Sequence, residues 1–259
     1  MTATRRLSIL RQTLESFYSK LFYQNDSYHY DLIVNIDPAG DDVPSMDIVN
    51  HCICTASHIP VTFNCPTTPS FPEAFRWVWK TALSTEADLV FNLEDDWILN
   101  RFLFMSDIYA IFDKYPELAI LRLSSFPSGL ITTKIWNKWT DAYNGSFFPI
   151  KDCDRGLLGF AGHPSFIRRS FVELAVECLD PKRNPEKQLK GRNKHLKDYF
   201  NTHMFGVYNQ PLNMPLIRDI GRKWMINNGF RKVGSKAHFV NWENMNSSSS
   251  SGSNSGSGR

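Results

Sequence analysis

The sequence predicts a layered α/β fold, a single Rossmann-like domain with a mainly parallel central sheet flanked by helices. Apolar residues recur alternately with the period of a buried strand and with that of an amphipathic helix. Acidic residues follow two of the strand patterns directly. Strands that alternate with helices favour a parallel sheet, in which the loops after the strands build the ligand site.

The first third of the chain carries two helix patterns and two strand patterns. Leucine and aromatic residues at three- and four-residue spacing predict a helix over 7–21. An apolar run at 30–36 predicts a buried strand, closed by the turn residues at 37–40. A shorter strand is expected at 59–63, and a second helix at 71–83.

The middle of the chain continues the alternation. The run at 87–93 predicts a strand that leads directly into the acidic residues that follow it. A helix is expected to begin near Asn100 and to carry Leu103, Ile108 and Phe112 on its buried face. A further buried strand is predicted at 118–123.

The last part of the chain is less regular. Ser170 and Glu173 have the spacing of a capping box at the start of a helix. Further helices are predicted from Asn184 and over 216–228, the latter ended by a glycine. A final short strand is expected at 238–242.

Composition limits both the number of domains and the class of partner. We expect one domain over 1–246, because the Ser, Gly and Asn residues of 247–259 cannot bury enough apolar surface to fold and should form a disordered tail. The 29 Lys and Arg residues nearly balance the 26 Asp and Glu residues, leaving a net charge of +3. This balance disfavours a nucleic-acid partner.

Cysteine content and hydropathy bear on the compartment. The five cysteines are odd in number and show no paired CxxC spacing. We interpret them as reduced thiols, which are typical of a cytoplasmic protein. No apolar run approaches the length of a transmembrane segment, and the N-terminal residues lack the apolar core of a secretory signal.

The strongest chemical signal is the acidic motif Glu94, Asp95 and Asp96, which follows a predicted strand and precedes Trp97. Three consecutive carboxylates repel one another, and a hard divalent cation would relieve that repulsion. Oxygen ligands suit Mg²⁺ or Mn²⁺, which often bridge to a substrate diphosphate. In extended backbone, Glu94 and Asp96 would face one pocket and Asp95 the other side. The alternative is a solvated acidic turn that caps the next helix.

The order of elements around this motif resembles glycosyltransferases of the GT-A fold, especially inverting enzymes of the large family-two type. In that superfamily a DxD-type motif ends a central strand and holds a metal and nucleotide complex, and the variant here is Glu-Asp-Asp. The resemblance covers about 2–242. It also implies a strand before the first helix, where only the residues 1–3 stand, so that strand is expected to be short or truncated.

The resemblance implies a role for each acidic residue of the donor site. Asp96 would bind the metal directly, and Glu94 and Asp95 would support the ribose, the donor sugar and the metal's waters. Asp37, at the end of an earlier strand, would contact the nucleotide base or ribose. A C-terminal histidine often completes the metal site in this superfamily, and His238 matches its position best, with His203 as the alternative.

Basic residues at both ends of the chain are candidates for the nucleotide and its diphosphate. By resemblance, Arg5 and Arg6 match the loop that touches the nucleotide, although surface charges before a helix would look the same. Arg218 and Arg222 are four residues apart, so they would share a helix face and attract the diphosphate. A solvent-facing helix is the alternative for that pair.

An inverting transfer needs a general base that removes the proton of the acceptor hydroxyl. In the resembling family a carboxylate follows a glycine-containing acceptor loop and a short helix, which here indicates Glu186. Asp154 is the competing candidate for the base. Gly162 and His163 lie in that loop and would contact the acceptor. Trp97, Trp136 and Trp139 would be core residues or stacking surfaces for sugar rings.

The sequence therefore predicts a glycosyltransferase that uses Mn²⁺ or Mg²⁺. It would move a sugar from a nucleotide-diphosphate donor to a hydroxyl of a glycan or glycoconjugate acceptor. A nucleotidyltransferase could share the fold and the acidic site, and a non-catalytic protein that binds sugars or nucleotides could share the cleft. The P-loop, GxGxxG, HExxH and GxSxG motifs are absent from the sequence.

Overall fold

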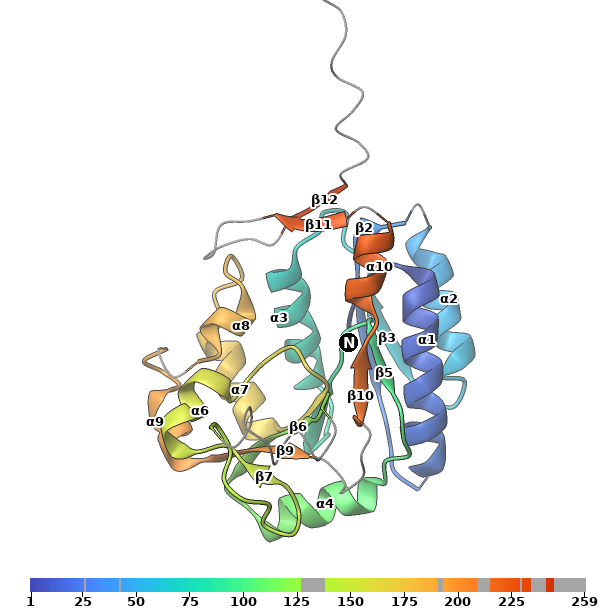
Figure 1. Ribbon diagram of the computed structural model, residues 1–259. Helices are drawn as coiled ribbons and strands as arrows, with labels where there is room; N and C mark the ends of the chain where they lie inside the picture. The colour runs from blue at the N-terminus through green and yellow to red at the C-terminus, as the bar shows by residue number, and fades with distance from the viewer. Residues whose placement is uncertain are drawn as a thin grey trace, which may run out of the picture.

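The computed structural model of the 259-residue chain has a mixed α/β architecture with helices on both sides of its strands (Figure 1). It describes residues 1–25, 27–41, 43–126, 138–190, 193–208, 215–228, 230–233 and 241–244. The expected layered α/β class is confirmed.

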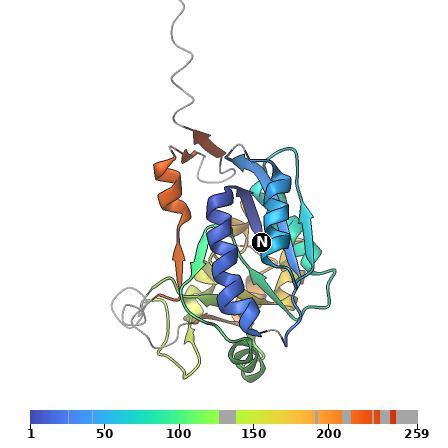
Figure 2. The same ribbon diagram turned by 90° about the vertical axis from the view of Figure 1, so that its right-hand side faces the viewer.

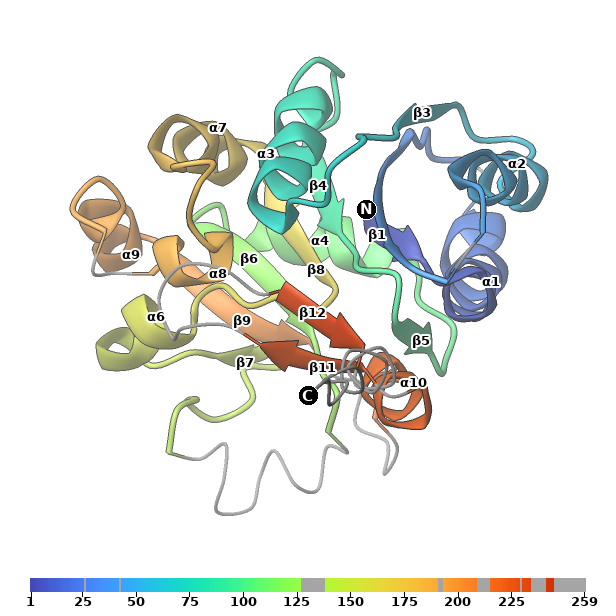
Figure 3. The same ribbon diagram turned by 90° about the horizontal axis from the view of Figure 1, so that it is seen from above.

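The first sheet is parallel and has the strand order β1-β2-β3. Helices α1 and α2 lie on one side of it and α3 lies on the other (Figure 3). After α1 the chain continues through the short helical turns η1 and η2. The elements are β1 (Thr2–Arg5), α1 (Leu7–Phe17), η1 (Tyr18–Phe22), η2 (Tyr23–Asn25), β2 (Leu32–Gly40), α2 (Ser45–Thr55), β3 (Val61–Asn64) and α3 (Phe71–Ala82).

The second sheet is mixed and has the strand order β4-β8-β6-β9-β7. Its β6 and β9 are parallel, whereas β8 is antiparallel to both of its neighbours. An isolated bridge from Thr2 to Glu94 connects β1 to the residues after β4, so the two sheets meet at the acidic motif. The strands are β4 (Leu89–Asn92), β6 (Leu118–Leu123), β7 (Phe148–Pro149), β8 (Ser165–Arg168) and β9 (Met204–Tyr208).

The remaining elements surround these sheets (Figures 1 and 2). Two further strand pairs, β5 with β10 and β11 with β12, are both antiparallel. The elements are β5 (Trp97–Leu99), α4 (Met105–Lys114), α6 (Asp152–Leu158), α7 (Arg169–Cys178), α8 (Pro185–Gln188), α9 (Lys197–Thr202), β10 (Ile217–Asp219), α10 (Gly221–Asn227), β11 (Phe230–Val233) and β12 (Asn241–Asn244).

Two apolar clusters hold the layers together. One joins α1 and α2 to the first sheet and to β5, and the other joins α3 and α7 to the second sheet. Trp79 is fully buried in the second cluster, and its Nε1 donates to Oδ1 of Asn92 at 3.2 Å. Trp97 is buried in the first cluster, and Trp139 packs on the second. Trp136 lies outside the described residues.

Several predicted boundaries in the first half are wrong. Strand β2 does not end before Asp37 but runs on to Gly40, because β1 pairs with it as far as that glycine. The helix expected from Asn100 begins at Met105 instead. The intervening residues include β5, which pairs with β10 from the far end of the chain. That partner could not be seen in the local pattern.

Two predicted features in the second half are also wrong. The helix expected over 216–228 is a strand, β10, followed by the shorter helix α10, since β5 offers an edge to pair with. The predicted capping box does not form. Helix α7 begins at Arg169, where Glu173 pairs with that arginine at 2.9 Å and Ser170 bonds to Tyr199.

All five cysteines are free thiols. Within the described parts of the chain, no helix combines the length and the apolarity needed to cross a bilayer.

Candidate functional site

A cavity of about 160 Å³ opens where β1, β2 and β4 end. The acidic motif forms one part of its wall, and the short helix α8 contributes from the other half of the chain. Carboxyl ends of neighbouring parallel strands are the usual place for a ligand site in a layered α/β fold. The cavity is lined by Thr2, Ala3, Thr4, Arg6, Asp37, Phe71, Glu94, Asp95, Asp96, Asn184 and Glu186.

Asp95 is fixed by contacts with the first residues of the chain. Its Oδ2 accepts hydrogen bonds from the amide and the hydroxyl of Thr4, both at 2.9 Å. Its Oδ1 lies 2.5 Å from Nη2 of Arg6, and only 3% of the residue is exposed. Both carboxylate oxygens therefore have protein partners, which identifies Asp95 as an anchor between β1 and the acidic motif.

Asp96 lies beside this anchor and is more accessible. Its Oδ2 is 3.3 Å from Nη2 of Arg6, and its side chain is 23% exposed. Burial, followed by repulsion from Asp95, raises the pKa of Asp96 to about 6. Burial alone would lower the pKa of Arg6, but Asp95 and Asp96 outweigh it and raise that pKa.

The expected orientation of the motif is wrong in one respect. Residues 95 and 96 form a turn, not extended backbone, so Glu94, Asp95 and Asp96 all line the same cavity. The turn lies between Glu94, which bridges to Thr2 of β1, and β5, which pairs with β10.

Glu94 and Glu186 approach each other across Gly162. The Gly162 amide donates to Oε1 of Glu186 at 2.6 Å. A Cβ placed on Gly162 would lie 2.6 Å from Oε1 of Glu94 and 2.8 Å from Oε1 of Glu186. Asn184 caps α8 by accepting from the Glu186 amide at 2.9 Å, which fixes the start of this short helix. Two carboxylates thus converge at a place where only glycine fits.

A buried arginine and a neutral histidine lie near Glu186 and Gly162. Burial lowers the pKa of Arg122 to about 10, and nearby Glu186 partly offsets that effect. Burial, and then Arg122, lowers the pKa of His163 to about 4, so its imidazole is neutral at pH 7. The His163 ring lies 4.8 Å from that of Trp97. A neutral imidazole can form a hydrogen bond with a hydroxyl group. It lacks the additional proton that an imidazolium could transfer to a substrate.

Asp37, in β2, and the half-buried Phe71, at the start of α3, both line the cavity. Burial raises the pKa of Asp37, while hydrogen bonds from the Ser70 backbone and from Asn35 oppose the shift. Nδ2 of Asn35 donates to Oδ1 of Asp37 at 3.1 Å. A carboxylate beside a half-buried aromatic ring can bind a ribose hydroxyl and pack against a base.

The structure does not bring every predicted residue to the cavity. Asp154 lies in α6 and lines no part of it. Arg218 is exposed in β10 and Arg222 is exposed in α10, so they do not share a helix face. Arg5 also does not line it, and its Nη2 donates to the Pro38 carbonyl at 3.2 Å.

Neither candidate histidine can be assigned to the metal site from its position. His238 lies outside the described residues. His203 stacks on Tyr199 with ring centroids 3.6 Å apart, at the end of α9, and is not among the residues that line the cavity.

Five residues of the cavity wall were not predicted as site residues: Thr2, Ala3, Thr4, Phe71 and Asn184. Phe71 fits the buried stripe of a helix pattern, and Thr4 looks like an ordinary polar residue before a helix. Asn184 gave a local signal, since Asn before Pro and Glu is typical of a helix N-cap. That signal predicted the helix but not its position at the site.

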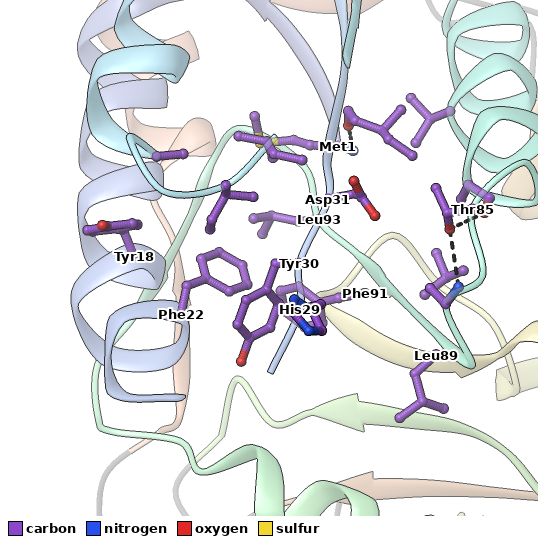
Figure 4. A pocket seen from close by; sticks show the side chains of 18 of the residues that line it. Met1, Tyr18, Phe22, His29, Tyr30, Asp31, Thr85, Leu89, Phe91 and Leu93 are labelled. Atoms are coloured by element: carbon purple, nitrogen blue, oxygen red, sulfur yellow. Dashed lines mark hydrogen bonds between the residues drawn. The ribbon is translucent and has the colours of Figure 1, made fainter. Parts of the chain in front are cut away.

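A second cavity, of about 150 Å³, lies between β2 and β4, and Met1 contributes to its wall (Figure 4). Aromatic side chains such as Tyr18, Phe22 and Phe91 line it, together with Met1 and Leu93. It shares no lining residue with the acid-lined cavity. Among the described residues that line it, Asp31 carries the one carboxylate.

The donor set of the acid-lined cavity determines whether it could hold a divalent cation. Within the described ranges, no three His, Cys, Asp or Glu residues are placed to hold a metal by themselves. Mg²⁺ and related ions usually bind through one or two carboxylates, completed by waters and substrate phosphates. Asp96, which is partly exposed and borders the cavity, fits such an incomplete site.

No family model matches the sequence, and no curated protein is significantly similar to it. Several solved structures align with most of the chain. A mannosyltransferase of Pyrobaculum calidifontis in complex with GDP-Man and Mn²⁺ is 11% identical, with a TM-score of 0.49 over 81% of this chain. The chain spans only 54% of that protein's length.

Two other solved structures show similar degrees of likeness. Glucosyl-3-phosphoglycerate synthase of Mycobacterium tuberculosis is 14% identical, with a TM-score of 0.48 over 88% of this chain and 74% of its own. CMP:2-keto-3-deoxy-manno-octonic acid synthetase, complexed with CTP, is 11% identical, with a TM-score of 0.46. The alignment covers 87% of this chain and 95% of the synthetase.

These likenesses bear on the fold alone. The described chain has a layered α/β fold with an acid-lined cavity near the ends of its first strands.

Proposed function

We propose that the protein transfers a sugar from a nucleotide-diphosphate donor to a hydroxyl of a glycan or glycoconjugate acceptor, with Mn²⁺ or Mg²⁺. The observation that carries this proposal is the charge of the cavity wall, where five carboxylates face one guanidinium. A divalent cation would neutralise that excess, and it would in turn attract a diphosphate. The carboxylates are Asp37, Glu94, Asp95, Asp96 and Glu186, and the guanidinium is that of Arg6.

On the donor side, Asp96 would hold the cation, because both Asp95 oxygens already have protein partners. The bound cation would neutralise the departing diphosphate. Asp37 would bind the ribose or base beside Phe71, which lines the same wall. The role of His238 as a further ligand remains a prediction from the resemblance.

On the acceptor side, Glu186 would act as the general base of an inverting transfer. The Gly162 amide orients the Glu186 carboxylate, which lies in the same cavity as Asp96. A general base must lie in the cavity that holds the donor, because it removes the proton of the hydroxyl that attacks the donor sugar. Glu94 would hold a substrate hydroxyl across Gly162. His163, neutral at pH 7, would offer a hydrogen bond to the acceptor.

The remaining expectations are part of the same proposal. The five free thiols support a reducing, cytoplasm-like compartment. The net charge of +3 supports a small-molecule and glycan partner over a nucleic acid. The catalytic domain would comprise 1–246, followed by the Ser- and Gly-rich tail.

The test is a thermal-shift screen of nucleotide-diphosphate sugars with and without Mn²⁺, followed by a transfer assay. A donor that binds with the metal should raise the melting temperature, and Asp96→Asn should lower transfer about a hundredfold. Asp113→Asn, which removes an exposed carboxylate from α4, is the matched control and should retain activity. Unchanged turnover in Asp96→Asn would refute the proposal.

Product analysis separates the main alternatives. Release of a nucleoside diphosphate indicates sugar transfer, whereas release of pyrophosphate from a nucleoside triphosphate indicates a nucleotidyltransferase. Donor binding with no product from any acceptor would indicate a non-catalytic binding protein.

A further inference from the structure

The Arg6 side chain lies between the acidic motif and α10. Its Nη2 is 2.5 Å from Oδ1 of Asp95 and 3.3 Å from Oδ2 of Asp96. Its Cζ lies 5.4 Å from the centroid of the Trp224 ring, within range of a cation–π interaction. Only 6% of the Arg6 side chain is exposed. One buried cation therefore links β1, the acidic motif and α10.

The first turn of α10 is fitted closely against Asp96. The Ile220 amide donates to the Asp96 carbonyl at 2.9 Å. A Cβ placed on Gly221 would lie only 2.1 Å from Oδ2 of Asp96, so no larger residue fits there. Oδ1 of Asp219 accepts from the Gly221 amide at 2.9 Å and stabilises this turn. Movement of the Asp96 carboxylate therefore affects α10 directly.

The two aspartates differ in how tightly they hold Arg6. Asp95 has the shorter contact, and its other oxygen is held by Thr4. Asp96 has the longer contact of 3.3 Å and the more exposed side chain. A buried carboxylate beside a half-buried one requires a nearby cation, since an uncompensated buried charge is costly. Asp96 is thus the carboxylate at which one cation can replace another.

We propose that Arg6 is the resident counter-cation of Asp96 and exchanges with the divalent cation when the diphosphate of the donor enters. This inference rests on the proposed function, because the incoming ion is the metal of that reaction. The metal alone must displace a paired guanidinium and should bind weakly. A diphosphate gives the displaced guanidinium a new anionic partner, so metal and donor bind better together.

The exchange also explains the position of Trp224. Its ring packs against the guanidinium while Arg6 contacts the aspartates. When Arg6 moves toward the diphosphate, the ring loses that cation and α10 shifts with Asp96. Emission from Trp224 should therefore report the exchange without any turnover.

The first experiment compares Mn²⁺ binding by the full chain and by Arg6→Met, using thermal shifts in Mn²⁺ and in EDTA. Arg6→Met should melt at a lower temperature in EDTA, because Asp95 and Asp96 lose their counter-charge. Mn²⁺ alone should restore much of that loss and bind at least about tenfold more tightly than to the unaltered chain. Arg5→Met, the matched control, should bind Mn²⁺ as the unaltered chain does, since Arg5 contacts the Pro38 carbonyl.

The second experiment uses the unaltered chain, so it does not depend on the folding of Arg6→Met. Mg²⁺ with a nucleoside diphosphate should change tryptophan emission, and Trp224→Phe should abolish that change. If Arg6→Met and the unaltered chain bind the metal with equal affinity, the proposed exchange is wrong. It is also wrong if the metal stabilises the protein while Trp224 emission stays constant. Either result would leave the proposed metal dependence standing. Failure of every chain to bind metal would overturn the proposed metal dependence as well.

Discussion

The amide of Gly162 donates a 2.6 Å hydrogen bond to Oε1 of Glu186 and thereby links the loop before β8 to the start of α8. The contact joins two segments that the sequence separates by a strand and a long helix. It places the candidate base opposite the acidic motif. The side-chain carboxylate is oriented before any substrate arrives, which is the arrangement expected of a catalytic group.

Gly162→Ala should reduce transfer by at least about tenfold, which corresponds to roughly 1.4 kcal/mol in the barrier. The new methyl group would collide with the carboxylates of both Glu94 and Glu186. Steady-state kinetics with a melting curve tests this. Gly206→Ala is the matched control, because its methyl group would meet Phe147 in the core and should lower stability with little effect on the activity of folded protein. A Gly162→Ala enzyme with unchanged kinetics would contradict the proposed site.

Glu186→Gln should lower the rate of transfer by roughly 10²–10⁴-fold while leaving donor binding almost intact. Glutamine retains an oxygen that can accept from the Gly162 amide, so local structure should persist, but it cannot take a proton. Asp154→Asn should remain active, because Asp154 does not line the cavity. Transfer rates of both variants at saturating donor provide the measurement. If only Asp154→Asn loses activity, Asp154 is the general base and Glu186 is not.

The pH dependence of stability should carry a contribution from Asp96. Burial, followed by repulsion from Asp95, raises the pKa of Asp96 from 3.8 to about 6, so the folded state holds this proton more tightly than the unfolded chain does. The contribution of Asp96 to the free energy of unfolding should therefore fall as pH rises from about 4 to about 6. Asn has no such proton, so the stability of Asp96→Asn relative to the unaltered chain should rise over that window. Urea titrations at several pH values measure the difference, and parallel pH profiles would contradict it.

Trp79→Phe should lower the free energy of unfolding by about 1–3 kcal/mol. The change leaves a space in the second apolar cluster and removes the donor to Oδ1 of Asn92. Trp77→Phe, on the same helix but only half-buried, should change stability by roughly 0.5 kcal/mol or less. Denaturant unfolding of the two variants tests the difference. If both variants lose the same free energy of unfolding, Trp79 does not contribute more to the core than Trp77 does.

Some site residues were predictable because their position follows from the chain around them. Asp37 lies in the last part of β2, and Glu94 and Asp96 follow β4. Local hydrophobic patterns predict both strands, and parallel strands bring such ends together. The Asn184 cap likewise predicted the start of α8. Arg218 and Arg222 show the limit of this reasoning. Their spacing suited one helix face, but pairing with β5 converts the first of them into a strand residue.

The sequence by itself determined the layered α/β class, most of the buried strands and the acidic motif at the end of one of them. These features depend on periodicity and on neighbours a few residues away. Only the tertiary structure decided that Asp95 is an anchor, that Asp96 borders the cavity and that Glu186 rather than Asp154 lies opposite. Each of those distinctions depends on a partner far along the chain, such as Arg6 for the aspartates, and packing alone selects such partners.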